Sequence, residues 1–218
     1  MKHFTSFDID ALEQLYKINL INSCTGYKSA NLIATQSAEK QTNVAVFSSV
    51  IHVGSAPALL GFILRPATVP RHTYENIKNT RFYTINHIHQ DIIEDAHHTS
   101  AKYPAAISEF DATQLTPEYK LDFMAPFVKN CPVQIGLEYV EEYHIKSNDT
   151  ILIVGAIKHL FVNDSIIQPD GLINLSEGKV AAINGLDSYV VPESLQQFGY
   201  QRPKKDILEK HQKTTSSL

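Results

Sequence analysis

Basic side chains and a threonine gather just before a segment that begins like a helix. The group comprises Arg65, Arg71, His72 and Thr73, with Asn76 one turn later. Guanidinium groups bind phosphate through charge-assisted hydrogen bonds, and the free N–H groups at a helix N-terminus favour an anion. This pattern predicts a phosphate site. The alternative is a set of surface charges beside a proline loop, with Thr73 serving only as a helix cap.

Residues for a flat apolar slot precede this cluster. Phe47 and Phe62 can supply apolar walls, and Ser48 and Ser49 offer hydroxyl and backbone groups to ring carbonyl and N–H groups. Both phenylalanines also suit a protein core, and both serines suit an edge strand. The apolar walls, the polar edge and the phosphate site fall within one short segment, 43–77, so we interpret them as parts of one binding site.

A second candidate site contains histidines and a carboxylate. His87 and His89 share one face of an expected strand, and Glu94 follows at the spacing of the first metal motif of cupins. The glycines that bracket the cupin motif are missing, since Arg81 and Ala101 occupy those positions. A polar strand end leading into a solvated helix, or histidines lining another pocket, are the alternatives. We therefore assign no metal ligand.

Composition excludes several classes of protein. Only 9 of the 218 residues are glycine, and none are spaced as in a dinucleotide fingerprint, a nucleophile elbow or a P-loop. The net charge of −4 gives no field that would attract nucleic acid. Cys24 and Cys131 lie far apart without further ligands at metal-binding spacing, so neither a disulfide framework nor a zinc knuckle is predicted.

The N-terminal residues and the apolar runs bear on localisation. Residues 1–8 turn polar where a signal peptide would be apolar. The longest apolar run, 56–64, is too short to cross a bilayer. These features predict a cytoplasmic chain without a membrane partner.

The elements that must position these side chains are mostly strands. Strands are expected at 31–38, 44–55, 58–64, 81–86, 133–145 and 150–162, the last two forming a hairpin. Helices are expected at 8–20, where Asp8 and Asp10 are candidate caps, and at 73–79 and 91–98. Residues 100–129 are expected to form loops with short helical pieces. This order predicts a mainly β, α+β chain in which a small barrel carries inserted helices.

Several of these pieces, in this order, resemble the flavin-reductase-like family of FMN-binding split barrels. Within 43–77 the likeness rests on Asn43, Ser48-Ser49, Ala56-Pro57-Ala58-Leu59 and Thr73-x-x-Asn76-Ile77. Residues 81–86, Ser100-Ala101-Lys102-Tyr103-Pro104 with Glu109-Phe110, and Gly185-Leu186-Asp187-Ser188-Tyr189 are also similar. The similarity runs from about Asn31 to Tyr189. Ala58 departs from it, since the family commonly has a second proline there.

The resemblance implies one split-barrel domain over residues 1–200 and FMN bound without a covalent bond. The polar composition from Gln201 onward predicts a tail over 201–218 that is partly helical and partly frayed. The resemblance also implies a homodimer with the flavin near the subunit interface, and hydride transfer from NADH or NADPH to flavin N5. No catalytic side chain is then required. The cofactor-binding residues expected are Asn43, Phe47, Ser48, Ser49, Phe62, Arg65, Arg71, His72, Thr73, Asn76 and Ser100.

Two rival functions stay open at this point. One is an FMN-binding electron carrier or sensor that does not turn over NAD(P)H. The other is a cupin-like metal-dependent enzyme that uses His87, His89 and Glu94. The sequence does not distinguish NADH from NADPH or FMN from FAD, and it does not reveal the terminal electron acceptor.

Overall fold

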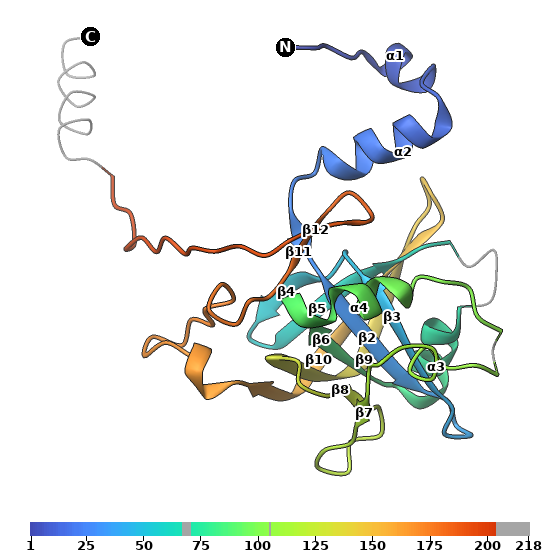
Figure 1. The fold of residues 1–218 in the computed structure, drawn as a ribbon, viewed down its shortest axis with the longest axis vertical. Helices are drawn as coiled ribbons and strands as arrows, with labels where there is room; N and C mark the ends of the chain where they lie inside the picture. The colour runs from blue at the N-terminus through green and yellow to red at the C-terminus, as the bar shows by residue number, and fades with distance from the viewer. Residues whose placement is uncertain (67–70, 105, 204–218) are drawn as a thin grey trace, which may run out of the picture.

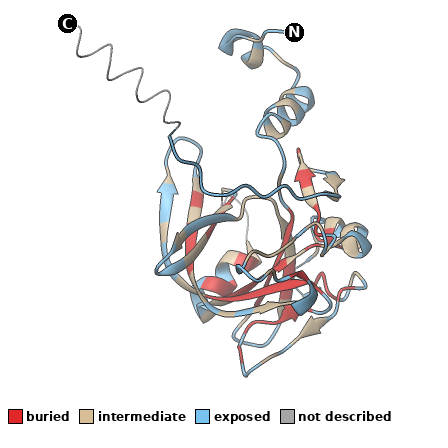
Figure 2. Ribbon diagram, turned by 90° about the vertical axis from the view of Figure 1, so that its left-hand side faces the viewer, coloured by how far each residue is buried: buried red, intermediate tan, exposed pale blue. Residues whose placement is uncertain are grey.

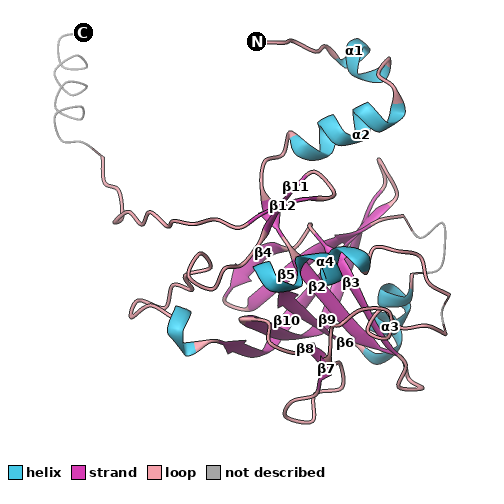
Figure 3. Cartoon of the chain, in the orientation of Figure 1, coloured by secondary structure: helices cyan, strands magenta, loops and turns pink. Residues whose placement is uncertain are grey.

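The structure is a computed structural model that describes residues 1–66, 71–104 and 106–203. The predicted tail, 201–218, therefore lies outside the described residues except for its first three positions. Within the described ranges the chain is mainly β with inserted helices, as predicted (Figures 1 and 3).

A seven-stranded sheet forms the body of the molecule. Its strand order is β3-β2-β6-β9-β10-β5-β4, and every neighbouring pair is antiparallel. The strands are β2 (Asn31–Gln36), β3 (Thr42–Phe47), β4 (Ile51–Ser55), β5 (Ala58–Leu64), β6 (Phe82–His87), β9 (Val133–Ile145) and β10 (Thr150–Val162). The sequence patterns predicted the β9–β10 hairpin and β5 at these bounds.

The sheet curls into a barrel that is split between its two edges. β3 and β4 follow one another in the chain, yet they form the opposite edges of the sheet. Residues 48–50 cross from one edge to the other. The prediction of a single strand over 44–55 was therefore wrong, because the chain leaves the first edge at Ser48 without a glycine or proline to mark the break.

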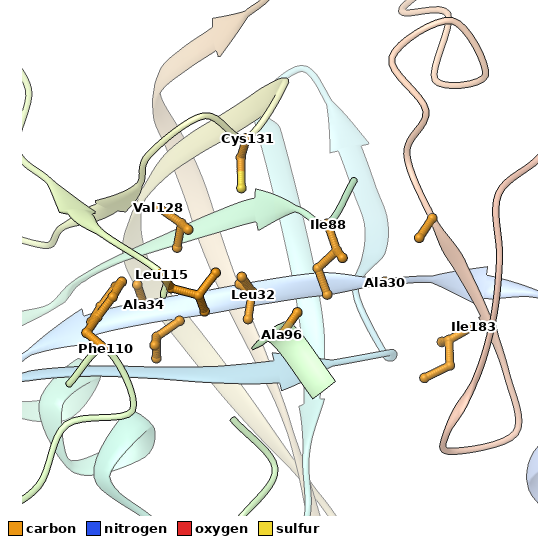
Figure 4. Packing of buried hydrophobic residues seen from close by; sticks show 12 residues of the cluster. Ala30, Leu32, Ala34, Ile88, Ala96, Phe110, Leu115, Val128, Cys131 and Ile183 are labelled. Atoms are coloured by element: carbon orange, nitrogen blue, oxygen red, sulfur yellow. The ribbon is translucent and has the colours of Figure 1, made fainter. Parts of the chain in front are cut away.

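The inner and outer faces of the sheet carry separate cores. The inner core includes Ile33, Phe62, Tyr83, Ile85, Leu137 and Ile153. The outer core gathers around Leu32 and Ala34 of β2 and is closed by Ala96, Phe110, Leu115 and Val128 (Figure 4). All six residues of β2 are buried, because this strand is covered by the inner core on one face and by the outer core on the other.

Short elements cover the outer face and the ends of the barrel. The 3₁₀ turn η1 (Gln90–Ile92) leads into α4 (Ile93–His98), matching the helix expected at 91–98. Residues 100–129 are mostly loop, as expected, but their described part contains no short helical piece, and β7 (Pro117–Glu118) pairs with β8 (Phe127–Val128) instead. A second 3₁₀ turn, η2 (Asp164–Ile166), follows β10.

Helix α3 (His72–Thr80) packs its buried residues Thr73, Asn76 and Ile77 into one end of the barrel. The helix begins one residue earlier than predicted, and its N-cap is Arg71 rather than Thr73. Thr73 is 6% exposed, so its hydroxyl serves the interior and not the cap.

The N-terminal residues form an arm and not the predicted helix over 8–20. Helices α1 (Ser6–Asp10) and α2 (Gln14–Ser23) are separate, and neither buries a residue against the described part of the chain (Figures 1 and 2). Thr5 caps α1 in a capping box with Asp8, and Glu13 caps α2, so the two expected aspartate caps were wrong.

The arm joins the barrel at a small second sheet. This sheet has the order β1-β11-β12 and contains β1 (Lys28–Ser29), β11 (Ala182–Asn184) and β12 (Ser188–Val190). Among the described helices, none has the length and apolar character needed to span a membrane.

Candidate functional site

A buried polar network ties α3 to strands β2 and β3. Asn43 Nδ2 donates to the hydroxyl of Thr73 at 3.1 Å and to that of Thr35 at 3.5 Å. Asn76 Nδ2 donates to Thr35 Oγ1 at 3.0 Å. The predicted residues Asn43, Thr73 and Asn76 therefore come together. Their common partner, Thr35, carried no signal in the sequence beyond its place in a strand.

Arg71 lies at the start of α3 with unused hydrogen-bonding capacity. One terminal nitrogen donates to the carbonyl of Pro66 at 3.3 Å. Its Nε is buried and has no hydrogen-bond partner among the described residues. Within the same residues Arg71 makes no side-chain cap for the helix. A buried guanidinium N–H beside an uncapped helix N-terminus fits an anion, and a phosphate group meets that requirement.

His72 and Glu109 flank the same helix start. Glu109 is 8% exposed, and its carboxylate accepts a hydrogen bond from the backbone N–H of Val44 at 3.1 Å. Burial raises the pKa of Glu109, while hydrogen bonds from the Glu109 and Val44 backbone N–H groups and the charge of His72 act in the opposite direction. The Glu109 carboxylate therefore holds the backbone of β3 at Val44 and lies close to His72. In the sequence, Glu109 contributed only to the family resemblance, and no role was predicted for it.

The segment that crosses the split forms the other end of the site. Ser49 Oγ donates to the carbonyl of Ile63 at 2.9 Å and accepts from the N–H of Ile63 at 3.2 Å. This hydroxyl continues the pairing of β5 beyond the first residue of β4, so it is already engaged. Ser48 is partly exposed and makes no side-chain hydrogen bond within the described ranges.

The two expected apolar walls pack against each other at this end. The rings of Phe47 and Phe62 lie 5.2 Å apart in an edge-on arrangement with an interplanar angle of 74°. Phe62 is fully buried between Phe47 and Tyr83. Phe47 keeps part of its surface exposed. Phe47 can therefore face a ligand directly, and Phe62 supports it from behind.

The two ends of the site are joined by one strand. Asn43 begins the polar network and Phe47 ends β3, so four strand residues of about 3.3 Å each separate them by about 13 Å. A ligand with a phosphate at one end and a flat ring at the other matches this layout. FMN has these two parts, joined by a five-carbon chain.

Two expected site residues stay apart from the network. Arg65 is exposed just beyond β5 and makes no side-chain hydrogen bond among the described residues. Ser100 is exposed after α4, where its backbone N–H bonds to the carbonyl of His97 at 3.0 Å. For both residues, a role in cofactor binding stays a prediction.

The histidine and carboxylate candidate does not assemble as a cupin-like centre. Over the described ranges, no three His, Cys, Asp or Glu side chains are grouped so that they could hold a metal ion. Glu94 is exposed on α4, and His89 faces Asp91 at 3.5 Å. The split barrel also differs from the double-sheet jelly roll of cupins, so the cupin-like alternative lacks its fold.

A cavity of about 350 Å³ lies away from the predicted residues. Its lining includes Lys120, Gln134 and Phe161, and it contains none of the residues of the candidate site. Lys120 is held there by Gln134 at 2.6 Å and by Glu118 at 3.0 Å. We assign the candidate site to the two ends of β3, because the unpaired Nε of Arg71 lies at the start of the helix that Asn43 bonds to, and the partly exposed Phe47 and Ser48 lie at the other end.

Comparison with known proteins identifies the family. A family model for the flavin reductase like domain matches residues 26–180. A crystal structure of a candidate flavin reductase with a split barrel domain from Shewanella frigidimarina is 46% identical and has a TM-score of 0.89. The match covers 92% of this chain and 100% of that one.

More distant proteins share the fold or part of the sequence. An FMN-binding protein from Thermus thermophilus has a TM-score of 0.67 at 14% identity, over 78% of this chain and 90% of that one. An uncharacterized protein of Methanothermobacter thermautotrophicus is 28% identical over 142 residues, 63% of this chain and 65% of that protein. This chain thus spans about two thirds of that relative. With most of its length matched, the chain belongs to the flavin reductase like domain family and has its split-barrel fold.

Proposed function

We propose that this protein binds FMN without a covalent bond and transfers hydride to it from NADH or NADPH. The observation that carries the proposal is the pair of half-sites near the two ends of β3. Among the described residues, the buried Nε of Arg71 has no hydrogen-bond partner at a helix start without a side-chain cap, and Asn43 bonds to this helix. Phe47 and Ser48 present a partly exposed apolar and polar edge about 13 Å along the strand from Asn43.

At the phosphate end, the chain supplies charge and oriented donors. Arg71, His72 and the first N–H groups of α3 surround the position of an anion. Thr73 is held by Asn43, so the helix start cannot shift relative to β3. The network therefore positions the phosphate end before any ligand arrives.

At the ring end, the chain supplies one wall and a polar edge. Phe47 is backed by Phe62, and Ser49 is locked onto β5, which leaves Ser48 and the backbone of residues 48–50 to meet the ring. Bound FMN supplies N5, the atom that accepts hydride. The protein needs only to orient two rings and exclude water, which agrees with the absence of an acid–base pair among the predicted residues.

Membership of the family and the similar FMN-binding protein support FMN as the cofactor and a nicotinamide nucleotide as the donor. We further propose that the protein works as a homodimer. The exposed apolar side chains of its N-terminal arm support this, since no described part of the same chain covers them.

The test is steady-state oxidation of NADH and NADPH by the purified protein with FMN, together with the absorption spectrum of the reconstituted protein. We expect flavin absorption bands at one flavin per chain and oxidation of at least one donor. Bound FMN without oxidation of either donor would show a flavin carrier and overturn the reductase proposal. Failure to bind FMN would overturn the whole proposal.

A further inference from the structure

Strand β9 contains a one-residue bulge at Val140. Gly155 of β10 lies opposite Tyr139 and Val154 lies opposite Glu141, so the register of the two strands shifts and Val140 has no residue of β10 opposite it. The side chain of Val140 is 44% exposed, so the bulge does not serve to bury it. A bulge can instead redirect the side chains next to it.

The bulge brings two polar residues to the same face of the sheet. Tyr139 and Glu142 are three positions apart, and in a regular strand residues at that spacing point to opposite faces. Here Tyr139 lies opposite Gly155, and Glu142 lies opposite Ile153, two residues away on β10. Directly paired residues share a face, so Tyr139 and Glu142 both lie on the face of Ile153, which belongs to the inner core.

Helix α3 lies against this face and is bound by both residues. The hydroxyl of Tyr74 donates to Glu142 Oε1 at 2.9 Å. Lys78 lies one turn later on the same side of the helix, and it donates to Glu142 Oε2 at 3.3 Å and to the hydroxyl of Tyr139 at 3.1 Å. The Lys78 ammonium also lies over the Tyr139 ring, 4.6 Å from its centroid. The two residues that the bulge brings together therefore hold one face of α3.

The Tyr74 hydroxyl contributes more to this contact than the ion pair does. The side chain of Lys78 is 40% exposed, and ion pairs open to water contribute little because both charges are solvated. The bond from Tyr74 to Glu142 is partly buried and has a carboxylate acceptor, which makes it stronger than a bond between neutral groups. Loss of the hydroxyl or of its acceptor should therefore release the helix at this point.

This contact reaches the phosphate end of the candidate site. Tyr74 lies in the first turn of α3, three residues after the N-cap Arg71, whose buried Nε has no partner among the described residues. The residue before it, Thr73, accepts a hydrogen bond from Asn43 of β3. Two successive residues of the first turn are therefore tied to β3 on one side and to β9 on the other. These two ties fix the direction in which the free N–H groups of the turn point.

We propose that Glu142 is a positioning residue for the flavin phosphate, because through Tyr74 it holds the first turn of α3 in the orientation that binds the anion. This inference rests on the proposed function, since it assumes that FMN occupies the candidate site. Glu142 acts through the helix and not by touching the ligand. A shift of the helix start would weaken recognition of the phosphate. Recognition of the ring at Phe47 would not change, because that end of the site is built on β3.

The first experiment tests the contact in the ligand-free protein. Amide hydrogen exchange measured by NMR reports the opening of the first turn, where the N–H of Glu75 donates to the carbonyl of Arg71. We expect this amide to exchange about 3- to 10-fold faster in Glu142→Leu and in Tyr74→Phe. Glu142→Gln keeps an acceptor for the Tyr74 hydroxyl and should retain more of the protection than Glu142→Leu. Glu141→Leu, an exposed neighbour on the opposite face of β9, is the control.

The second experiment measures dissociation constants for FMN and for riboflavin, which lacks the phosphate. We expect Glu142→Leu and Tyr74→Phe to lower the preference for FMN over riboflavin by about 3- to 10-fold, the range for one hydrogen bond. The affinity for riboflavin itself should not change. Glu142→Gln should retain more of the preference than Glu142→Leu, and Glu141→Leu should retain all of it.

The outcomes separate this inference from the proposed function. Equal exchange of the Glu75 amide in the natural chain and in Glu142→Leu overturns the inference, whether or not the protein binds FMN. Faster exchange with equal losses of FMN and riboflavin affinity overturns the phosphate role of Glu142 and leaves the proposed function standing. Failure of the natural chain to bind FMN overturns the proposed function and this inference with it. Faster exchange together with a lower preference for FMN, both smaller in Glu142→Gln and absent in Glu141→Leu, supports the inference.

Discussion

At the scale of single residues, Arg71 is the side chain on which phosphate recognition depends most. Its Nε is buried without a partner among the described residues, and its other contact is to one backbone carbonyl. A guanidinium placed in this way loses little by binding an anion, because it forms no ion pair with any described residue that would have to be broken first. Recognition of the phosphate should therefore be separable from recognition of the ring.

We expect Arg71→Met to weaken FMN binding by about 10- to 100-fold, the range for a hydrogen bond to a charged group. Binding of riboflavin, which has no phosphate, should not change. Flavin fluorescence titrations measure both affinities, and Arg202→Met, an exposed arginine, is the matched control. Equal losses for FMN and riboflavin would contradict a phosphate contact.

The neutral imidazole of His87 also makes stability depend on pH. Its pKa falls from 6.5 to about 4 on folding, so the unfolded chain takes up the proton first as the pH drops. The contribution to stability is complete above about pH 6.5 and is lost toward pH 4, amounting to about 3 kcal/mol. Urea unfolding across this pH range should show a free energy of unfolding that falls steeply as the pH drops. His87→Phe should reduce this pH dependence, and His144→Phe should retain it.

At the scale of elements, the contact between β6 and β10 depends on one missing side chain. A methyl group at Gly155 would collide with the hydroxyl of Tyr83, and Tyr83 Cζ would lie 2.9 Å from it. That hydroxyl is buried without a partner among the described residues. Burial also raises the pKa of Tyr83, so it stays neutral. The glycine thus admits the full tyrosine ring into the barrel.

Gly155→Ala should destabilise the fold by about 1–3 kcal/mol through overpacking. Tyr83→Phe should cost less than about 1 kcal/mol, because the lost hydroxyl had no partner. The double variant should recover part of the loss, since the nearest atom has gone. Urea unfolding measures all three, with Gly199→Ala as the control because nothing lies within 4 Å of its added methyl group. Full stability of Gly155→Ala would refute this packing.

The elements also show what periodicity can and cannot predict. Alternating β-branched residues predicted β5, β9 and β10 at their observed bounds, because each strand has a consistent buried face. The crossing at 48–50 was missed because its serines and valine also suit a strand. The arm was predicted as one amphipathic helix over 8–20, and it instead forms two short helices that contain no buried residue.

Part of the polar network in the candidate site could be predicted because its residues lie close together in the sequence. Asn43, Thr73 and Asn76 belong to one short segment, and the structure joins them. Thr35 and Glu109 are brought in by strand pairing and by a distant loop, which no local pattern encodes. Ser49 was read as a ring contact, and its hydroxyl is used by Ile63, a role set by the topology of the split.

At the scale of the whole molecule, the N-terminal arm exposes apolar side chains that the proposed homodimer would cover. Leu15 and Ile21 are 63% and 43% exposed on a helix of ten residues, a length that is marginal for an isolated helix in water. We expect light scattering after size exclusion to give twice the 24.4 kDa mass of one chain. Leu15→Glu with Ile21→Glu should lower that mass, and Asn19→Glu should not. A natural chain that is monomeric would contradict the proposed homodimer.

The crossing of residues 48–50 has a mechanical consequence for the barrel. These residues are the covalent link between the two sheet edges, and Ser49 fastens the link to β5. A ring bound against these residues would contact both edges of the sheet at once and hold them together. Cofactor binding would then limit how far the two edges can separate, so the same three residues would affect both the affinity for the ligand and the opening motion of the barrel.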